Sequence, residues 1–98
     1  MNNILKWTDR AMAEYEKLLE YLYEEWSEEI AQRVITEINY TVLRIKNSPE
    51  QFQIFNKRRK VRRCVASAQT SIFFKIKKDC IEILSVFDNR QSPRKRKL

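Results

Sequence analysis

The sequence predicts an α+β domain in which a helical hairpin packs on a small, mostly antiparallel β-sheet. Three observations lead to this prediction. Residues 9–46 carry apolar side chains at helical spacing, and residues 80–87 are apolar at nearly every position. Between them, Ile72, Phe74 and Ile76 recur at every second position, the period of a strand with one buried face. The expected order of elements is β-α-α-β-β-β, and 98 residues are enough for one modest core. We therefore expect residues 1–98 to form a single domain.

The first two elements are a short strand over residues 4–7 and a helix over residues 9–26. Thr8 and Asp9 stand where a side-chain oxygen can accept from the first-turn amides of that helix. Apolar residues then recur at 3–4 spacing and predict one buried stripe, which consists of Met12, Tyr15, Leu19, Leu22 and Trp26.

A second helix is predicted to follow almost without a connector. Ser27 is a plausible N-cap, and the helical period of apolar residues continues from Ile30 to Ile45. Pro49 ends the helix because proline restricts the residue before it and cannot donate a hydrogen bond. Two helices joined this tightly must fold back on each other as an antiparallel pair.

The C-terminal half is expected to supply the rest of the sheet. Residues 51–56 are predicted as a loop, residues 61–65 as a strand and residues 66–70 as a turn. Residues 80–87 are apolar on both sides, which is typical of an inner strand with both faces covered. The chain ends in a polar exit, of which residues 91–98 form a basic tail.

Composition excludes several kinds of catalytic site. The chain contains no histidine and no glycine, so it has no Ser-His or Cys-His pair, no His-ligated metal and no glycine-rich phosphate loop. We expect no metal and no cofactor. Cys64 and Cys80 lack CxxC spacing and are interpreted as buried free thiols, with a disulfide or a metal site as the alternatives. No apolar run is long enough to cross a membrane, and the expected location is the cytoplasm.

Charge is distributed unevenly along the chain. Residues 1–56 contain 6 Lys/Arg and 10 Asp/Glu, whereas residues 57–98 contain 14 Lys/Arg and 3 Asp/Glu. The densest part is residues 57–63, where six of seven side chains are cationic. Such a concentration indicates a surface for a polyanion or an acidic partner, and the alternative is solvated charge that protects a sheet edge from aggregation.

The order of elements on a chain of this length resembles the RelE/ParE superfamily of toxins from bacterial type II toxin–antitoxin systems, and the resemblance covers nearly the whole chain. The resemblance is carried by Lys60-Val61-Arg62-Arg63, by residues 72–76, and by the ending Phe87-Asp88-Asn89-Arg90-Gln91-Ser92-Pro93. It implies a cognate antitoxin with an acidic or amphipathic segment as partner, and higher-order toxin–antitoxin complexes. The superfamily contains two mechanisms: RelE-like toxins cut messenger RNA on the ribosome, whereas ParE-like toxins poison DNA gyrase.

The sequence departs from the RelE pattern at two places. Ser71 stands where an arginine is usual, and no tyrosine follows Arg90. Groups that cleave RNA act as a unit, so these losses favour the ParE-like, non-enzymatic reading over ribosome-dependent cleavage. If the protein is a ribonuclease, the catalytic candidates are Arg62, Arg63 and Arg90.

The residues predicted to contact the target or the antitoxin are cationic: Lys57, Arg58, Arg59, Lys60, Arg62, Arg63 and Arg90. Arg90 has an alternative structural role, in which it pairs with a carboxylate such as Asp88 or Glu82. A different class of function also stays open, namely a small basic nucleic-acid-binding module.

Overall fold

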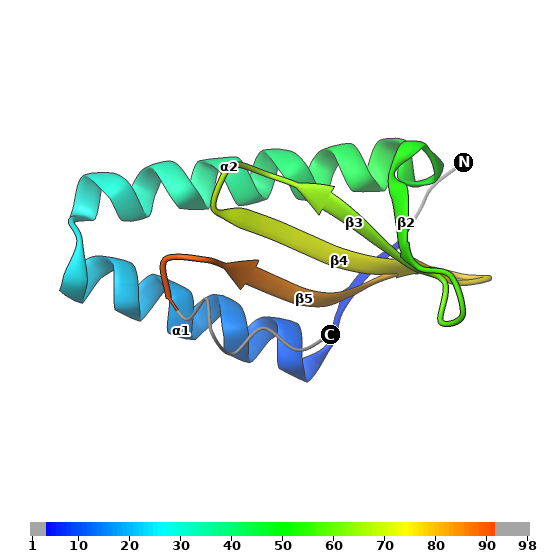
Figure 1. The fold of residues 1–98 in the computed structure, drawn as a ribbon, viewed down its shortest axis with the longest axis horizontal. Coiled ribbons are helices and arrows are strands. Elements are labelled where there is room, and N and C mark those ends of the chain that lie inside the picture. The colour runs from blue at the N-terminus through cyan, green and yellow to red at the C-terminus, as the bar shows by residue number, and fades with distance from the viewer. Residues whose placement is uncertain (1–3, 92–98) are drawn as a thin grey trace.

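The structure is a computed structural model that describes residues 4–91. Nearly all of the predicted basic tail at residues 91–98 lies outside this range. Figure 1 shows the antiparallel pair of helices and the strands that run along them. The elements are β1 (Leu5–Trp7), α1 (Asp9–Glu25), α2 (Glu28–Asn47), the 3₁₀ helix η1 (Pro49–Gln51), β2 (Gln53–Asn56), β3 (Val61–Val65), β4 (Thr70–Ile76) and β5 (Ile81–Asp88).

The strands form one five-stranded sheet in the order β1-β5-β4-β3-β2. β1 pairs with β5 in parallel, and the other three pairs are antiparallel. The prediction of an α+β fold with a mostly antiparallel sheet is therefore confirmed. β5 lies between β1 and β4, so the prediction that residues 80–87 form an inner strand is confirmed as well.

The prediction of a loop over residues 51–56 was wrong for most of that segment. Gln53–Asn56 pairs with β3 and adds an edge strand that the expected order did not contain. The register shifts between Ile54 and Asn56, and the side chains of Ile54 and Phe55 are both about half exposed. An irregular edge strand of this kind has no alternation of buried and exposed residues, which is the signal by which strands are predicted.

Both helices begin at the predicted caps. The Thr8 hydroxyl accepts from the amide of Ala11 at 3.0 Å, and the Ser27 hydroxyl accepts from the amide of Ile30 at 3.1 Å. Each cap satisfies a first-turn amide that would otherwise have no partner, so a cap residue in the sequence predicts the first residue of its helix to within one position.

The buried stripe of α1 is displaced from the predicted one by about one residue. Ala11, Leu18 and Leu22 are fully buried, whereas Met12 and Trp26 are 50% and 51% exposed. Alanine is a weak hydrophobic signal in a periodic pattern. The prediction therefore assigned Met12, which has the larger apolar side chain, to the buried stripe in place of its neighbour Ala11.

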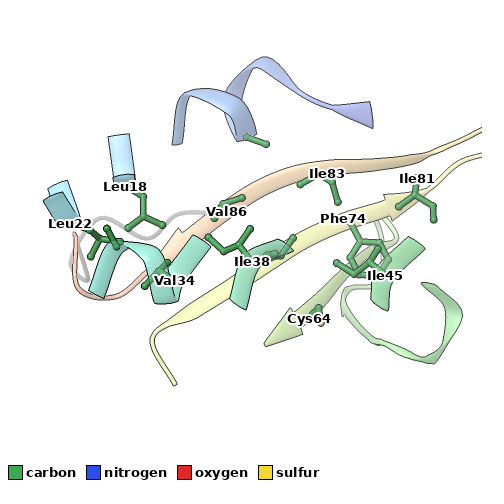
Figure 2. Packing of buried hydrophobic residues seen from close by; sticks show 13 residues of the cluster. Leu18, Leu22, Val34, Ile38, Ile45, Cys64, Phe74, Ile81, Ile83 and Val86 are labelled. Carbon is green, nitrogen blue, oxygen red and sulfur yellow. The ribbon is translucent and has the colours of Figure 1, made fainter. Parts of the chain in front are cut away.

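The core lies between the two helices and one face of the sheet. Figure 2 shows Leu18 and Leu22 from α1 and Val34 and Ile38 from α2 directed toward the β5 residue Val86. The full cluster is Ala11, Leu18, Leu22, Ala31, Val34, Ile38, Ile45, Cys64, Ile72, Phe74, Ile81, Ile83 and Val86.

The other face of the sheet carries neither helix, which corrects the expectation that both faces of residues 80–87 are covered. On β5 the alternate positions Glu82, Leu84 and Phe87 are only half-buried. Leu84 belongs to a smaller apolar cluster on this helix-free face, where Phe73 is 2% exposed and contacts Phe55 with 4.8 Å between the ring centroids. A second apolar patch, rather than a second layer of helices, accounts for the doubly apolar run.

The first helix also completes the edge of the sheet where β1 ends. β1 pairs with β5 only as far as Ile83, and beyond this point the Glu14 carboxylate of α1 accepts from the amide of Val86 at 3.0 Å and from the hydroxyl of Ser85 at 2.7 Å. An unpaired strand amide costs free energy when it is buried, so this carboxylate replaces a missing strand partner.

The two cysteines are free thiols, with Cys64 buried on β3 and Cys80 half-buried before β5. Burial raises the pKa of the Cys64 thiol, although the charge of Arg44 opposes this shift. Within residues 4–91 there is no helix long and apolar enough to span a membrane.

Candidate functional site

The basic segment at residues 57–63 forms the β2–β3 hairpin loop and the start of β3. The loop, residues 57–60, connects the paired residues Asn56 and Val61 and is exposed. The side-chain oxygen of Asn56 accepts from the backbone amide of Arg59 at 3.0 Å, and Lys60 has φ of 58°. Because a side chain in this left-handed region costs about 1 kcal/mol or more, the rest of the hairpin must stabilise the turn. Four consecutive cationic side chains are thereby held at one tip of the sheet.

Arg62 and Arg63 point to opposite faces of β3. Arg62 Nη1 donates to the carbonyl oxygens of Glu50 and Phe52 at 3.1 and 2.8 Å, so it holds η1 and the entry to β2. Arg63 pairs with Phe73 in the sheet and lies on the helix-free face, where its Nε donates to the Ser71 hydroxyl at 3.1 Å. Adjacent strand residues always diverge in this way. The two arginines therefore cannot bind the same phosphate.

Arg90 is engaged by a buried carboxylate immediately after β5. Its Nε and Nη2 donate to the two oxygens of Asp88 at 2.9 and 2.8 Å, and its backbone amide donates to the same carboxylate at 2.9 Å. The Asp88 side chain is fully buried and also accepts from the Thr70 hydroxyl. The hydrogen bond with Asp88 raises the pKa of Arg90. This geometry is the structural alternative for Arg90, in which the guanidinium compensates a buried charge.

Two aromatic residues of the first helical segment hold the chain at Arg90. The Tyr21 hydroxyl donates to the carbonyl oxygen of Arg90 at 2.8 Å and accepts from the Trp26 indole at 3.3 Å. The Trp26 ring centroid lies 6.0 Å from the Arg90 guanidinium carbon, within the range of a cation–π contact. Sequence reasoning sought an aromatic partner after Arg90 and missed Tyr21, because 69 residues separate the two and only the tertiary fold brings them together.

The three catalytic candidates do not converge. Arg62 and Arg63 lie on opposite faces of the sheet, and Arg90 lies at Thr70, whereas Arg62 pairs with Phe74. Thr70 and Phe74 are four residues apart on one strand, a separation of roughly 13 Å at ~3.3 Å per residue. Cleavage of a phosphodiester requires donors and acceptors held within hydrogen-bond distance of one reacting group. These three arginine side chains are too far apart to reach one common reacting group. Nor do residues 4–91 contain three His, Cys, Asp or Glu side chains close enough together to hold a metal ion.

Comparison with known proteins gives a family for this arrangement. A family-level sequence profile described as the ParE toxin of the type II toxin–antitoxin system parDE matches residues 5–93. A search among curated protein sequences gave no match.

Solved structures with the same fold include toxins and toxin–antitoxin complexes. The chromosomal ParDE system from P. aeruginosa matches with a TM-score of 0.75 and 22% identity, covering 88% of this chain and 95% of the other. A YoeB/ParE toxin from Agrobacterium tumefaciens matches with a TM-score of 0.61 and 13% identity, covering 87% and 96%. The toxin–antitoxin complex DinJ-YafQ from E. coli matches with a TM-score of 0.62 and 4% identity, covering 94% and 98%. At these identities the likeness establishes the fold.

Proposed function

The chain belongs to the ParE toxin family and is the toxin of a type II toxin–antitoxin system, and from this we propose that it arrests growth by inhibiting DNA gyrase without cutting RNA. We choose DNA gyrase as the target because it is the target of the ParE-like toxins within the superfamily. The choice against RNA cleavage rests on one observation, which is that Arg62, Arg63 and Arg90 each engage a separate part of the fold. A group of cations that stabilises a developing phosphate charge must be aimed at a single point.

The proposed partner of the free toxin is an antitoxin with an acidic or amphipathic segment. The hairpin loop at residues 57–60 presents only cations, so acidic side chains would find complementary charge there. A disordered acidic segment can lie along such a surface and become ordered on binding. We place the encounter in the bacterial cytoplasm, where gyrase and newly made antitoxin are both present.

A paired assay tests the proposal. The purified protein is added to a gyrase supercoiling reaction and, separately, to ribosomes on messenger RNA analysed by primer extension. We expect loss of supercoiling and no cuts in the message. Clean cuts in the ribosomal A site that disappear in the Arg90→Ala variant would overturn the proposal and support the ribonuclease alternative.

The Ser71→Arg variant provides a second test of the same point. Ser71 lies on the helix-free face beside Arg63, on the opposite side from Arg62 and Arg90. An arginine at this position would still not bring the cations together, so we expect the variant to cut no RNA. Appearance of cleavage in this variant would show that the separation of the three arginines is not what prevents the reaction.

A further inference from the structure

The helix-free face of the sheet contains a cavity that the function proposed above does not use. Its volume is about 140 Å³. It crosses the sheet from the start of α1 to the β2–β3 loop, and its lining comes from five elements and one loop: Arg10, Phe55, Asn56, Arg59, Val61, Phe73 and Leu84.

The floor of this cavity is apolar and its size suits one large side chain. Phe73 is nearly inaccessible, and Phe55, which is 47% exposed, stands against it in an edge contact. Val61 and Leu84 complete the apolar lining. An engineered cavity of ~150 Å³ is known to take up benzene, so a space of this volume accommodates a single aromatic or aliphatic group.

The walls of the cavity are cationic on two sides. Arg59 comes from the hairpin loop, next to three further cations, and no acidic residue lies within that loop. Arg10 comes from the first turn of α1, where its Nε pairs with Glu14 at 3.2 Å. Glu14 in turn accepts from Val86 and Ser85, which keeps it at the edge of the sheet. A ligand with one apolar group and neighbouring negative charges is complementary to this combination.

Two ligand classes have this chemistry, an acidic peptide and a nucleotide, and the lining favours the peptide. A base needs hydrogen-bond partners along its edges. Base edges present donors as well as acceptors, whereas the Asn56 side-chain oxygen already accepts from the amide of Arg59 and the other polar side chains of the lining are guanidiniums, which donate but cannot accept. A base also stacks on exposed ring faces, and of the two lining rings only that of Phe55 is exposed, because Phe73 is 2% exposed. An apolar side chain requires neither.

We propose that this cavity is the anchor site for a large apolar side chain within an acidic segment of the antitoxin. The inference rests on the proposed function in that it takes the antitoxin as the partner. It specifies what the antitoxin must contain, which is an aromatic or long aliphatic residue flanked by aspartates or glutamates. Binding there would place the flanking carboxylates beside the cationic hairpin loop.

The test uses the whole chain and three blocked pentapeptides as probes. The first has a central phenylalanine between two pairs of glutamates, the second has alanine at the centre, and the third has lysines in place of the glutamates. Isotope-labelled protein is titrated with each peptide up to millimolar concentration, and the amide chemical shifts are followed by NMR. We expect saturable shifts at Phe55, Phe73 and Leu84 with the first peptide only.

Two pairs of variants on neighbouring residues make the assignment specific. Phe55→Ala is compared with Ile54→Ala, because the two residues are equally exposed but Ile54 pairs with Arg62 on the helix side of the sheet. We expect Phe55→Ala to weaken binding about tenfold, corresponding to ~1.4 kcal/mol, and Ile54→Ala to leave it unchanged. Arg59→Gln should weaken binding about two- to fivefold, as for exposed ion pairs, and more than Arg58→Gln, which alters the same loop outside the cavity.

Several results would overturn the inference. These are absence of shifts at the cavity up to millimolar peptide, equal loss of binding in both members of either pair, or shifts at the same amides with an oligothymidylate but not with the acidic peptide. Each variant is first compared with the unaltered protein by circular dichroism, and the Arg59–Arg58 pair decides the question if Phe55→Ala fails to fold. The outcome is independent of the supercoiling assay on the unaltered protein, so failure of the anchor site and failure of the gyrase proposal are separately visible.

Discussion

Replacing Arg90 with alanine distinguishes its structural role from a role in target binding. The Asp88 side chain is 0% exposed and that of Arg90 is 15% exposed, so the variant leaves a buried carboxylate without its counter-charge. Removing one partner of a buried ion pair typically costs 3–5 kcal/mol. Here the Thr70 hydroxyl and the backbone amide of residue 90 still donate to the carboxylate. We therefore expect the lower end of that range, about 3 kcal/mol.

Urea denaturation followed by circular dichroism measures this cost. With a typical dependence of about 1–3 kcal/mol per molar urea for a small protein, the midpoint should fall by roughly 1–3 M. Arg58→Ala is the matched control, since Arg58 is exposed in the hairpin loop, and it should change the free energy of unfolding by no more than about 0.5 kcal/mol. If Arg90→Ala is as stable as Arg58→Ala, the argument from the buried pair is refuted.

The same variant also tests whether Arg90 contacts the target. Supercoiling inhibition is measured under conditions in which the denaturation curve shows the variant to be folded. If the role of Arg90 is structural, folded Arg90→Ala inhibits gyrase as the unaltered protein does. A loss of inhibition by folded protein would assign a target contact to the guanidinium, whose donors to Asp88 occupy only part of its hydrogen-bonding capacity.

Three further predictions concern the core and its titratable groups. Ile83→Ala, at a fully buried position of β5, should lower the free energy of unfolding by about 2–5 kcal/mol in urea denaturation, and a change below ~1 kcal/mol would argue against the core position. Thiol titration of unfolded protein should find two free groups, and in folded protein Cys64 should react more slowly than Cys80. Burial raises the pKa values of Tyr15 and Cys64, so the folded state holds these protons more tightly than the unfolded chain. The free energy of unfolding should then fall as pH rises above about 9, and less steeply in a Tyr15→Phe variant, whereas a flat alkaline profile would contradict this.

Local chemistry made most of the fold predictable. Thr8 and Ser27 offer side-chain caps, a helical period of apolar residues follows each of them, and Pro49 closes the second helix. The errors occurred where local signals are weak. Gln53–Asn56 is a short edge strand with a shifted register, and Ala11 is a buried residue with little apolar weight. In both cases it is the tertiary contact, rather than the side-chain pattern, that stabilises the observed arrangement.

The candidate site was predictable only to the extent that it depends on strand geometry. The period of two along a strand is sufficient to place Arg62 and Arg63 on opposite faces. The hydrogen bond from the Tyr21 hydroxyl to the Arg90 carbonyl oxygen joins segments far apart in the chain, and no local sequence pattern predicts it. The same holds for Arg10 and Arg59, which reach one cavity from the first helix and the β2–β3 loop. Charge counts could identify the basic segment but not which of its members act together.

The distribution of hydrogen-bond partners among the arginines explains how the basic segment can stabilise the fold and still present exposed cations to the proposed partner. Arg62 and Arg90 are bound to backbone carbonyls and to a buried carboxylate, so a partner could recruit them only by breaking contacts that stabilise the fold. The hairpin loop at residues 57–60 is exposed, and the loop hydrogen bond from Arg59 uses its backbone amide rather than its guanidinium. A partner can therefore bind the loop cations without destabilising the toxin. Arg62 follows the loop cations closely in sequence, and strand pairing is what separates its structural role from the binding role proposed for them.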